Sequence, residues 1–131
     1  MSFALDVSRF VEKAKKNPEK VMRQVSIKLF SAIIKASPVD TGRFRMNWMA
    51  SGSTPADGTT DVTDKSGNTA TGKVTSFVLN AADWHTFTLT NNLPYAQRLE
   101  YGWSQQAPQG MVRTNVSRFQ QLLNEEASRV K

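Results

Sequence analysis

The chain has 131 residues, of which 39% are hydrophobic, and a formal net charge of +6. This length fits a single domain over residues 1–131, and the hydrophobic content argues against disorder throughout. The absence of cysteine excludes disulfides and thiolate metal sites, and no apolar run approaches the ~20 residues of a membrane-spanning helix. We expect a protein made and used in the cytosol, or a virion part assembled there.

Charge is unevenly spread along the chain. Residues 1–36 hold eight Lys or Arg and three Asp or Glu, whereas residues 51–72 hold one Lys and three Asp. A basic surface favours contact with nucleic acid or with an acidic protein face, but lysines also keep helices soluble. The charge pattern alone leaves these alternatives open.

Two helices are predicted at the N-terminal end. Apolar residues at helical spacing predict an amphipathic helix over residues 3–16, and Pro18 suits the first position of a second helix, about 18–36. The second helix is apolar nearly all round, which predicts burial on more than one side. It lies either between the sheet and another helix or between the sheet and a neighbouring subunit. Its apolar stripes include Ile27, Phe30 and Ile34.

A sharp turn and a strand are predicted next. Pro38 cannot continue a helix, and Gly42 can adopt a positive φ without steric cost. Residues 43–50 alternate, which predicts a half-buried strand. Its inner face would carry Phe44, Met46 and Trp48, and its outer face would carry Arg43 and Arg45.

Residues 51–72 differ in composition from the rest of the chain. They include six Thr, three Ser and four Gly, and Val62 is their only bulky apolar residue. So little apolar area cannot offset the entropy of ordering the chain. This pattern predicts a long arm or hairpin that is mobile alone and becomes ordered against a partner, with a plain flexible loop as the alternative.

The C-terminal half alternates between helix and strand. The patterns predict a helix at 73–83, a strand at 85–90, a short helix at 94–101 and a last helix at about 111–130. The fold class is therefore α+β, a small antiparallel sheet packed against N-terminal and C-terminal helices. Glu100 lies where the helix dipole disfavours an acid, which suggests an ion pair with Arg43 or Arg45.

The sequence offers little for catalysis, so we predict no enzyme, no metal and no cofactor. His85 is the only histidine, and neither a nucleophile elbow nor a phosphate-binding glycine loop is present. The spacing of Asp57, Asp61 and Asp64 faintly suggests calcium, but the glycine and glutamate of an EF-hand are misplaced. Arg43 and Arg45, together with the lysines of the helices, leave a basic nucleic-acid-binding module as the alternative function.

Three blocks of sequence resemble a known family. They are Pro38-Val39-Asp40-Thr41-Gly42-Arg43-Phe44-Arg45 followed by Trp48, then Tyr95-Ala96-Gln97-Arg98-Leu99-Glu100-Tyr101-Gly102, then Ala107-Pro108-Gln109-Gly110-Met111-Val112. In this order and spacing the blocks resemble the neck or tail-completion proteins of long-tailed bacteriophages, which include tail terminator-like, head–tail joining proteins. The family pattern falls on Pro38, Asp40, Thr41, Gly42, Arg43, Tyr95, Ala96, Glu100, Gly102, Pro108, Gly110 and Met111, which we interpret as mainly fold-determining.

The resemblance implies a non-enzymatic virion protein at the head–tail junction, assembled in the host cytoplasm. Such a protein would form a ring, a hexamer or alternatively a dodecamer, that joins the tail tube or tail terminator to the head connector on the portal side. DNA would cross the channel without sequence recognition, and no membrane would be involved. The residues expected to contact sister copies or partners are Arg43, Arg45, Val62, Ile27, Phe30, Ile34 and Glu100. The segment 51–72 is longer than the short hairpin associated with many members.

Overall fold

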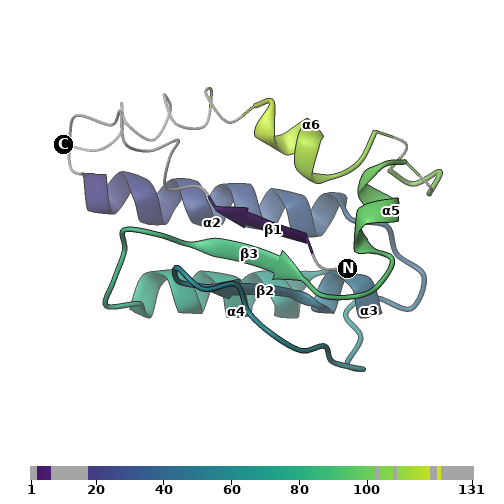
Figure 1. The fold of residues 1–131 in the computed structure, drawn as a ribbon, viewed down its shortest axis with the longest axis horizontal. Coiled ribbons are helices and arrows are strands. Elements are labelled where there is room, and N and C mark those ends of the chain that lie inside the picture. The colour runs from purple at the N-terminus through teal and green to yellow at the C-terminus, as the bar shows by residue number, and fades with distance from the viewer. Residues whose placement is uncertain (1–2, 7–17, 103, 108, 119–120, 122–131) are drawn as a thin grey trace.

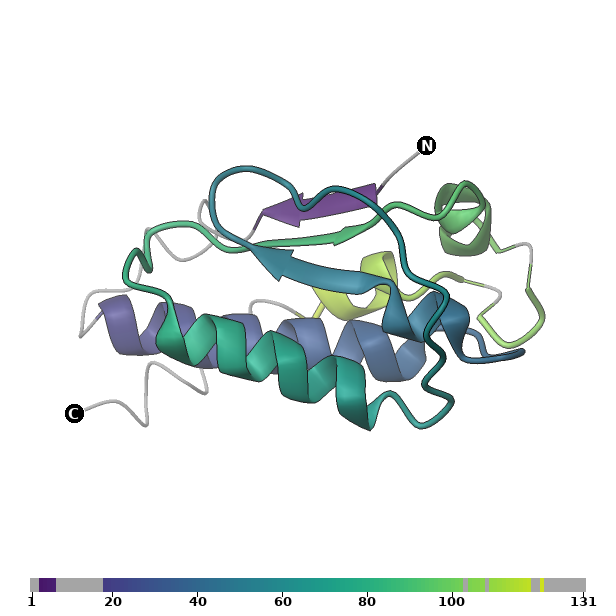
Figure 2. The same cartoon turned by 90° about the horizontal axis from the view of Figure 1, so that it is seen from below.

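The computed structural model describes residues 3–6, 18–102, 104–107, 109–118 and 121, and it has an α+β fold. One layer is a three-stranded antiparallel sheet, and the other contains two long helices that lie side by side against one face of that sheet (Figures 1 and 2). The elements in chain order are β1 (Phe3–Asp6), α2 (Pro18–Ala36), α3 (Arg43–Met46), β2 (Trp48–Ser51), α4 (Asn68–Asn80), β3 (Thr88–Asn91), α5 (Ala96–Glu100) and α6 (Val112–Val116).

The sheet has the order β1-β3-β2, so its central strand comes last in the sequence. Leu89 of β3 pairs with Leu5 of β1 on one side and with Ala50 of β2 on the other. All four residues of β3 are buried. The sheet therefore joins chain segments more than 80 residues apart around one buried strand.

The core lies between the sheet and the helical layer. Leu29 and Ile33 of α2, Val74 and Val78 of α4, and Leu89 of β3 are all at most 1% exposed. Burial of side chains of this size stabilises a fold by roughly 1.5–3 kcal/mol each. The prediction of a helix over 18–36 buried on several sides is confirmed, since α2 packs against both the sheet and α4.

The N-terminal prediction is wrong where the structure tests it. Residues Phe3–Asp6 form β1 and pair with β3 in place of starting a helix. Ladder hydrogen bonds to the exposed edge of β3 satisfy backbone groups that a helix would satisfy internally, so tertiary pairing overrides the local pattern. The rest of the predicted helix 3–16 lies outside the described residues.

The predicted strand 43–50 is half wrong. Arg43–Met46 is the helical turn α3, and β2 begins only at Trp48. Gly42 starts this turn, since its carbonyl accepts a hydrogen bond from the Met46 N–H at 3.2 Å. Phe44, Met46 and Trp48 are nevertheless all buried, so the alternation predicted which side chains face inward but not the backbone conformation.

The later elements match the predictions with shifted bounds. The helix expected at 73–83 begins earlier, at Asn68, and the strand expected at 85–90 is Thr88–Asn91. The short helix expected at 94–101 is α5, and Gly102 follows it with φ +90°. The described part of the predicted helix 111–130 contains α6, and most of the remainder lies outside the described residues. No helix in the described part of the chain has the length and apolar character needed to cross a membrane.

Candidate functional site

The three sequence blocks meet at one end of the molecule (Figure 1). We call this the motif end: residues 38–45, 95–102 and the described residues of 106–113, where Gln106 and Arg113 flank the third block. Gln106 pairs with the backbone of Val39 through two hydrogen bonds of 2.8 Å, one donated by its Nε2 and one accepted by its Oε1. The rings of Phe44 and Tyr95 lie 6.0 Å apart. Segments separated by up to 67 residues are thereby joined into one surface.

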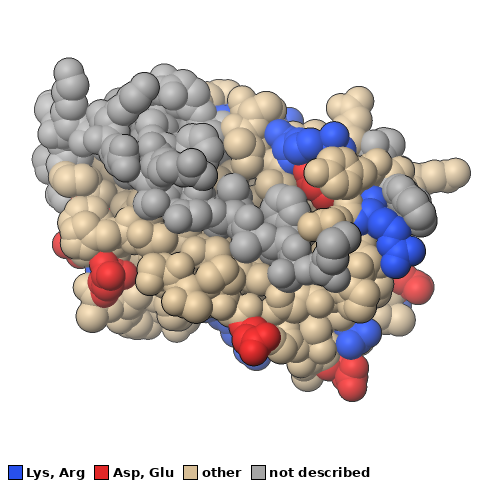
Figure 3. All heavy atoms as spheres, viewed as in Figure 1, with Lys and Arg blue, Asp and Glu red and all other residues tan. Residues whose placement is uncertain are grey.

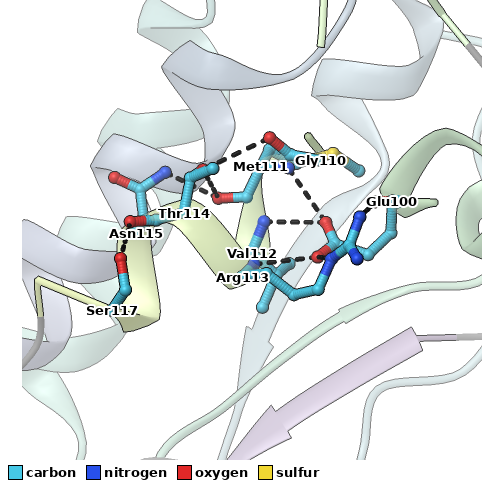
Figure 4. Close-up of polar contacts among 8 residues, drawn as sticks. All are labelled: Glu100, Gly110, Met111, Val112, Arg113, Thr114, Asn115 and Ser117. Carbon is cyan, nitrogen blue, oxygen red and sulfur yellow. Dashed lines mark hydrogen bonds and ion pairs between the residues drawn. The ribbon is translucent and has the colours of Figure 1, made fainter. Parts of the chain in front are cut away.

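Glu100 joins α5 to α6 (Figure 4). Its side chain is buried, and its Oε1 accepts hydrogen bonds from the N–H groups of Met111 and Val112 at 2.9 and 2.8 Å. Its Oε2 accepts bonds from the backbone N–H and the Nε of Arg113 at 2.8 and 3.1 Å. Because the first N–H groups of a helix have no partners within the helix, this carboxylate acts as the cap of α6.

Gly110 allows this close approach. It has φ +82°, and a Cβ at this position would lie only 2.3 Å from the carbonyl oxygen of Glu100. The prediction that Glu100 pairs with Arg43 or Arg45 is wrong, since Arg113 is the partner. The dipole argument identified an acid that needs a partner, but the α5–α6 junction determines which one it has.

Arg45 stabilises the end of α2. Its three side-chain nitrogens donate to the carbonyl oxygens of Lys35, Ser37 and Lys65 at 2.7 to 3.0 Å. Arg43 donates from Nε to the carbonyl of Thr60 at 3.1 Å and forms an ion pair with Asp61 at 3.2 Å. The predicted basic face shared by both arginines on one strand is therefore wrong, because both side chains bind the main chain of other segments.

The segment from Gly52 to Asp64 is held against the chain by polar contacts, and we call it the acidic loop. Asn47 is fully buried, and its side-chain amide pairs with both backbone groups of Thr60, each at 2.9 Å. Asn92 donates to the carbonyls of Ala56 and Gly58 at 2.9 and 3.1 Å. Figures 1 and 2 show the loop returning past the end of β2 on the side of the sheet away from α2 and α4.

The prediction of a hairpin at 51–72 is wrong, because residues 52–67 form no strand and the last five residues belong to α4. The segment does have polar contacts with the rest of its own chain, through Asn47 and Asn92. Its predicted ordering against a partner stays a prediction. Asn47 and Asn92 were not identified from the sequence as functional residues. The available signal was two asparagines placed immediately next to strand residues, where a side-chain amide can imitate a neighbouring strand.

The expected contact residues separate by burial. Phe30, Ile34 and Glu100 are at most 1% exposed, so their prediction as partner contacts is wrong for this structure. Ile27 is partly buried against the core, whereas Val62 is 56% exposed.

The remaining family-pattern residues have varied environments. Ala96 and Met111 lie in the core, and Pro38 is buried. Asp40 is exposed, and Thr41 accepts a hydrogen bond from the N–H of Arg43. Pro108 lies outside the described residues.

In the part of the chain that the structure describes, several carboxylates have structural partners. Asp64 caps the start of α4, where its carboxylate accepts bonds from the N–H groups of Gly67 and Ala70, and Asp61 faces Arg43. His85 is exposed, precedes β3 and lies 2.8 Å from Asp83. Among the described residues no group of three or more His, Cys, Asp or Glu is arranged to hold a metal ion.

Comparison of this chain with protein-family models, with curated proteins and with solved structures gave no match. The class that the fold defines is a small α+β domain.

Proposed function

We propose that this chain is a structural virion protein of the phage head–tail junction, which assembles as a ring between the tail tube and the head connector. The observation that supports the proposal is the motif end. The three blocks that carry the resemblance are separate in sequence, yet the first contacts the second through Phe44–Tyr95, and the second contacts the third through Glu100 and the N–H groups of Met111 and Val112. Gln106, immediately before the third block, binds the backbone of Val39 in the first. If the similarity of the three blocks to the family had arisen by chance, there would be no reason to expect the blocks to contact one another in the fold.

The chemistry of the site fits a structural role better than catalysis. The one carboxylate buried at the motif end is Glu100, and its oxygens are occupied by three backbone N–H groups and by Arg113. A general acid or base needs a proton that it can exchange with a substrate within hydrogen-bonding reach. Glu100 instead stabilises the position of α6.

The alternative function, a basic nucleic-acid-binding module, has less support. Arg43 and Arg45 were its central residues, and their side chains bind backbone carbonyls and Asp61. A protein that neutralises six or more phosphates loses roughly 10³-fold in affinity between 50 and 200 mM salt. Absence of DNA binding even at low salt would exclude this alternative.

The proposal is tested by assembling phage particles without this chain. Electron microscopy should show filled heads and complete tails that remain separate, and adding back the purified chain should restore joining. The variant Gly110→Ala, which drives a Cβ into Glu100, should restore joining poorly, while Gly52→Ala, where a Cβ meets no atom within 4 Å, should restore it fully. Intact, infectious particles formed without the chain would overturn the proposal.

A further inference from the structure

Two exposed surfaces of the molecule differ in the sign of the charges that they carry. The acidic loop carries Asp57, Asp61 and Asp64 and no Lys or Arg. The side chain of Asp61 is 97% exposed, and the neighbouring Val62 is 56% exposed. An exposed apolar side chain beside an exposed carboxylate, on a segment whose path is fixed, is a combination that contributes little to the stability of the monomer.

The second surface lies where α5 and α6 meet, and we call it the Tyr–Arg platform: Tyr101 and Arg113. Tyr101 is 64% exposed, and the guanidinium carbon of Arg113 lies 5.1 Å from the centre of its ring. Nε of Arg113 binds the carboxylate of Glu100 and Nη2 binds its carbonyl, but neither bond involves Nη1, and the side chain remains 53% exposed.

The platform borders an open hollow of about 490 Å³, which is also lined by Gln109, Thr114 and Ser117. Arg98 and Arg118 add positive charge to the same two segments, and Figure 3 shows Lys and Arg side chains gathered over α5 and α6 on this face. Tyrosine and arginine are the residue types that most often dominate binding energy at protein interfaces. Since both side chains are already positioned in the monomer, little conformational entropy is lost when a partner binds.

We propose that the acidic loop of one copy docks on the Tyr–Arg platform of a second copy, with Val62 in the hollow beside Tyr101 and Asp61 near Arg113. This inference rests on the self-assembly that the proposed function requires. Asp61 also faces Arg43, and Arg113 also binds Glu100, within one copy. The acidic loop nevertheless holds three Asp, and residues 96–118 hold three Arg and one Glu, so the two surfaces differ in sign, and each presents one exposed apolar side chain.

In Figure 1, α6 lies above the strands, beyond β1, and the acidic loop runs below them, beyond β2. The two surfaces therefore lie at opposite edges of the sheet. The contact is therefore heterologous: one patch on each copy binds a different patch on the next. Such contacts propagate and close into a ring where the rotation between copies allows. In this proposal the acidic loop, which lies within the arm that the sequence predicts to become ordered against a partner, forms one half of a subunit interface.

The test uses two variants that each remove one half of the contact, Val62→Arg and Tyr101→Ala. Both positions are exposed, so both variants should fold as the parent does. Sedimentation velocity of the parent chain should show oligomers, and each variant alone should associate about tenfold or more weakly. Leu79→Ser, at another exposed apolar position, is the matched control and should associate as the parent does.

Mixing the two variants gives the decisive result. The intact loop of the Tyr101→Ala chain can dock on the intact platform of the Val62→Arg chain, and the resulting pair has no competent surface left. The mixture should therefore form 1:1 dimers and nothing larger. Oligomers of unchanged mass in either variant, a mixture that stays monomeric, or a parent chain that is monomeric at its highest soluble concentration would overturn the inference.

The particle experiment keeps this inference separate from the proposed function. If heads and tails fail to join without the chain, but join normally with Val62→Arg or Tyr101→Ala, the head–tail role stands and only the docking surface is wrong.

Discussion

The core and the acidic loop are ordered in different ways. In α2, eight of 19 residues are buried, most of them apolar, and they pack against α4 and the sheet. Between Gly52 and Ser66 no residue is buried, and the main chain is instead bound by side chains of Asn47 and Asn92. Composition predicts whether a segment can bury apolar area, but it does not predict whether other residues will bind its backbone.

The largest expected effect belongs to the core. Leu29→Ala removes a fully buried side chain and should lower the free energy of unfolding by about 2–5 kcal/mol. Urea denaturation measures this value, and Leu79→Ala at a 54% exposed position should change it far less. A small loss at Leu29 would contradict the description of α2 as the centre of the core.

The junction between core and loop should be the next most sensitive position. Gly42 has φ +92°, and a Cβ there would lie 2.5 Å from the backbone nitrogen of Lys65. Backbone strain in Gly42→Ala should lower the free energy of unfolding by about 1–3 kcal/mol. The loss should be larger still because the atoms that the new Cβ would meet belong to the main chain and cannot rotate away. Thermal or urea unfolding measures this loss, and Gly52→Ala, where a Cβ meets no atom within 4 Å, is the neutral control. Equal losses in the two variants would show that the backbone of Asp64 and Lys65 does not pack closely against Gly42.

A change at Asn47 tests whether polar contacts alone order the loop. In Asn47→Asp the carboxylate cannot donate to the part-buried carbonyls of Thr60 and Arg43, so each carbonyl loses one of its donors. The fully buried side chain also becomes charged, and together these changes should lower the free energy of unfolding by about 1–3 kcal/mol. Hydrogen exchange at the Thr60 amide and proteolysis within the loop should both accelerate. Thr59→Asp adds the same charge at an exposed position, and comparable acceleration in that variant would contradict the role of Asn47.

The smallest expected effect concerns Asp64 and depends on pH. Burial acts to raise the pKa of Asp64, but hydrogen bonds from the Ala70 N–H, the Ser66 hydroxyl and the Gly67 N–H outweigh it, so this pKa lies below 3.8. A pKa lowered by folding means that the carboxylate stabilises the fold at neutral pH. That contribution is lost as the pH falls below 3.8.

Urea unfolding at a series of pH values measures this contribution. Asp64→Ala should lower the free energy of unfolding by about 1 kcal/mol at pH 7, because it removes the side chain that caps α4. Asp64→Asn keeps an acceptor that does not ionise and should flatten the acid side of the stability curve. An unchanged acid side in Asp64→Asn would show that this carboxylate does not contribute to the pH dependence.

Burial patterns explain which parts of the fold the sequence predicts. The apolar stripes of α2 and the alternation of Phe44, Met46 and Trp48 identify side chains that must leave water, and the structure buries them. The same patterns do not determine backbone conformation where a pairing partner is distant. Phe3–Asp6 became a strand because β3 offers an unpaired edge, and that edge is formed 85 residues later.

The candidate site was predictable only in outline. The dipole argument showed that Glu100 needs a partner, and the partner is determined by the connector that brings Gly110 and Arg113 back to α5. Periodicity could not show that Phe30, predicted as a partner contact, is buried within the monomer. A helix that is apolar on two sides has the same sequence pattern whether its second side packs against α4 or against a neighbouring subunit. Nothing in the sequence pattern indicated that Tyr101 and Arg113 lie together, and only the fold shows the guanidinium of Arg113 over the ring of Tyr101.

The side chains of Asn47 and Asn92 form their hydrogen bonds to the acidic loop with main-chain atoms of Ala56, Gly58 and Thr60, not with the side chains of these residues. The outward residues of that stretch can therefore be exchanged during evolution without redirecting its course. One scaffold could in this way acquire new adhesive specificities by point substitution, and foreign peptides grafted at Asp61 to Thr63 should be displayed without redesign of the underlying domain.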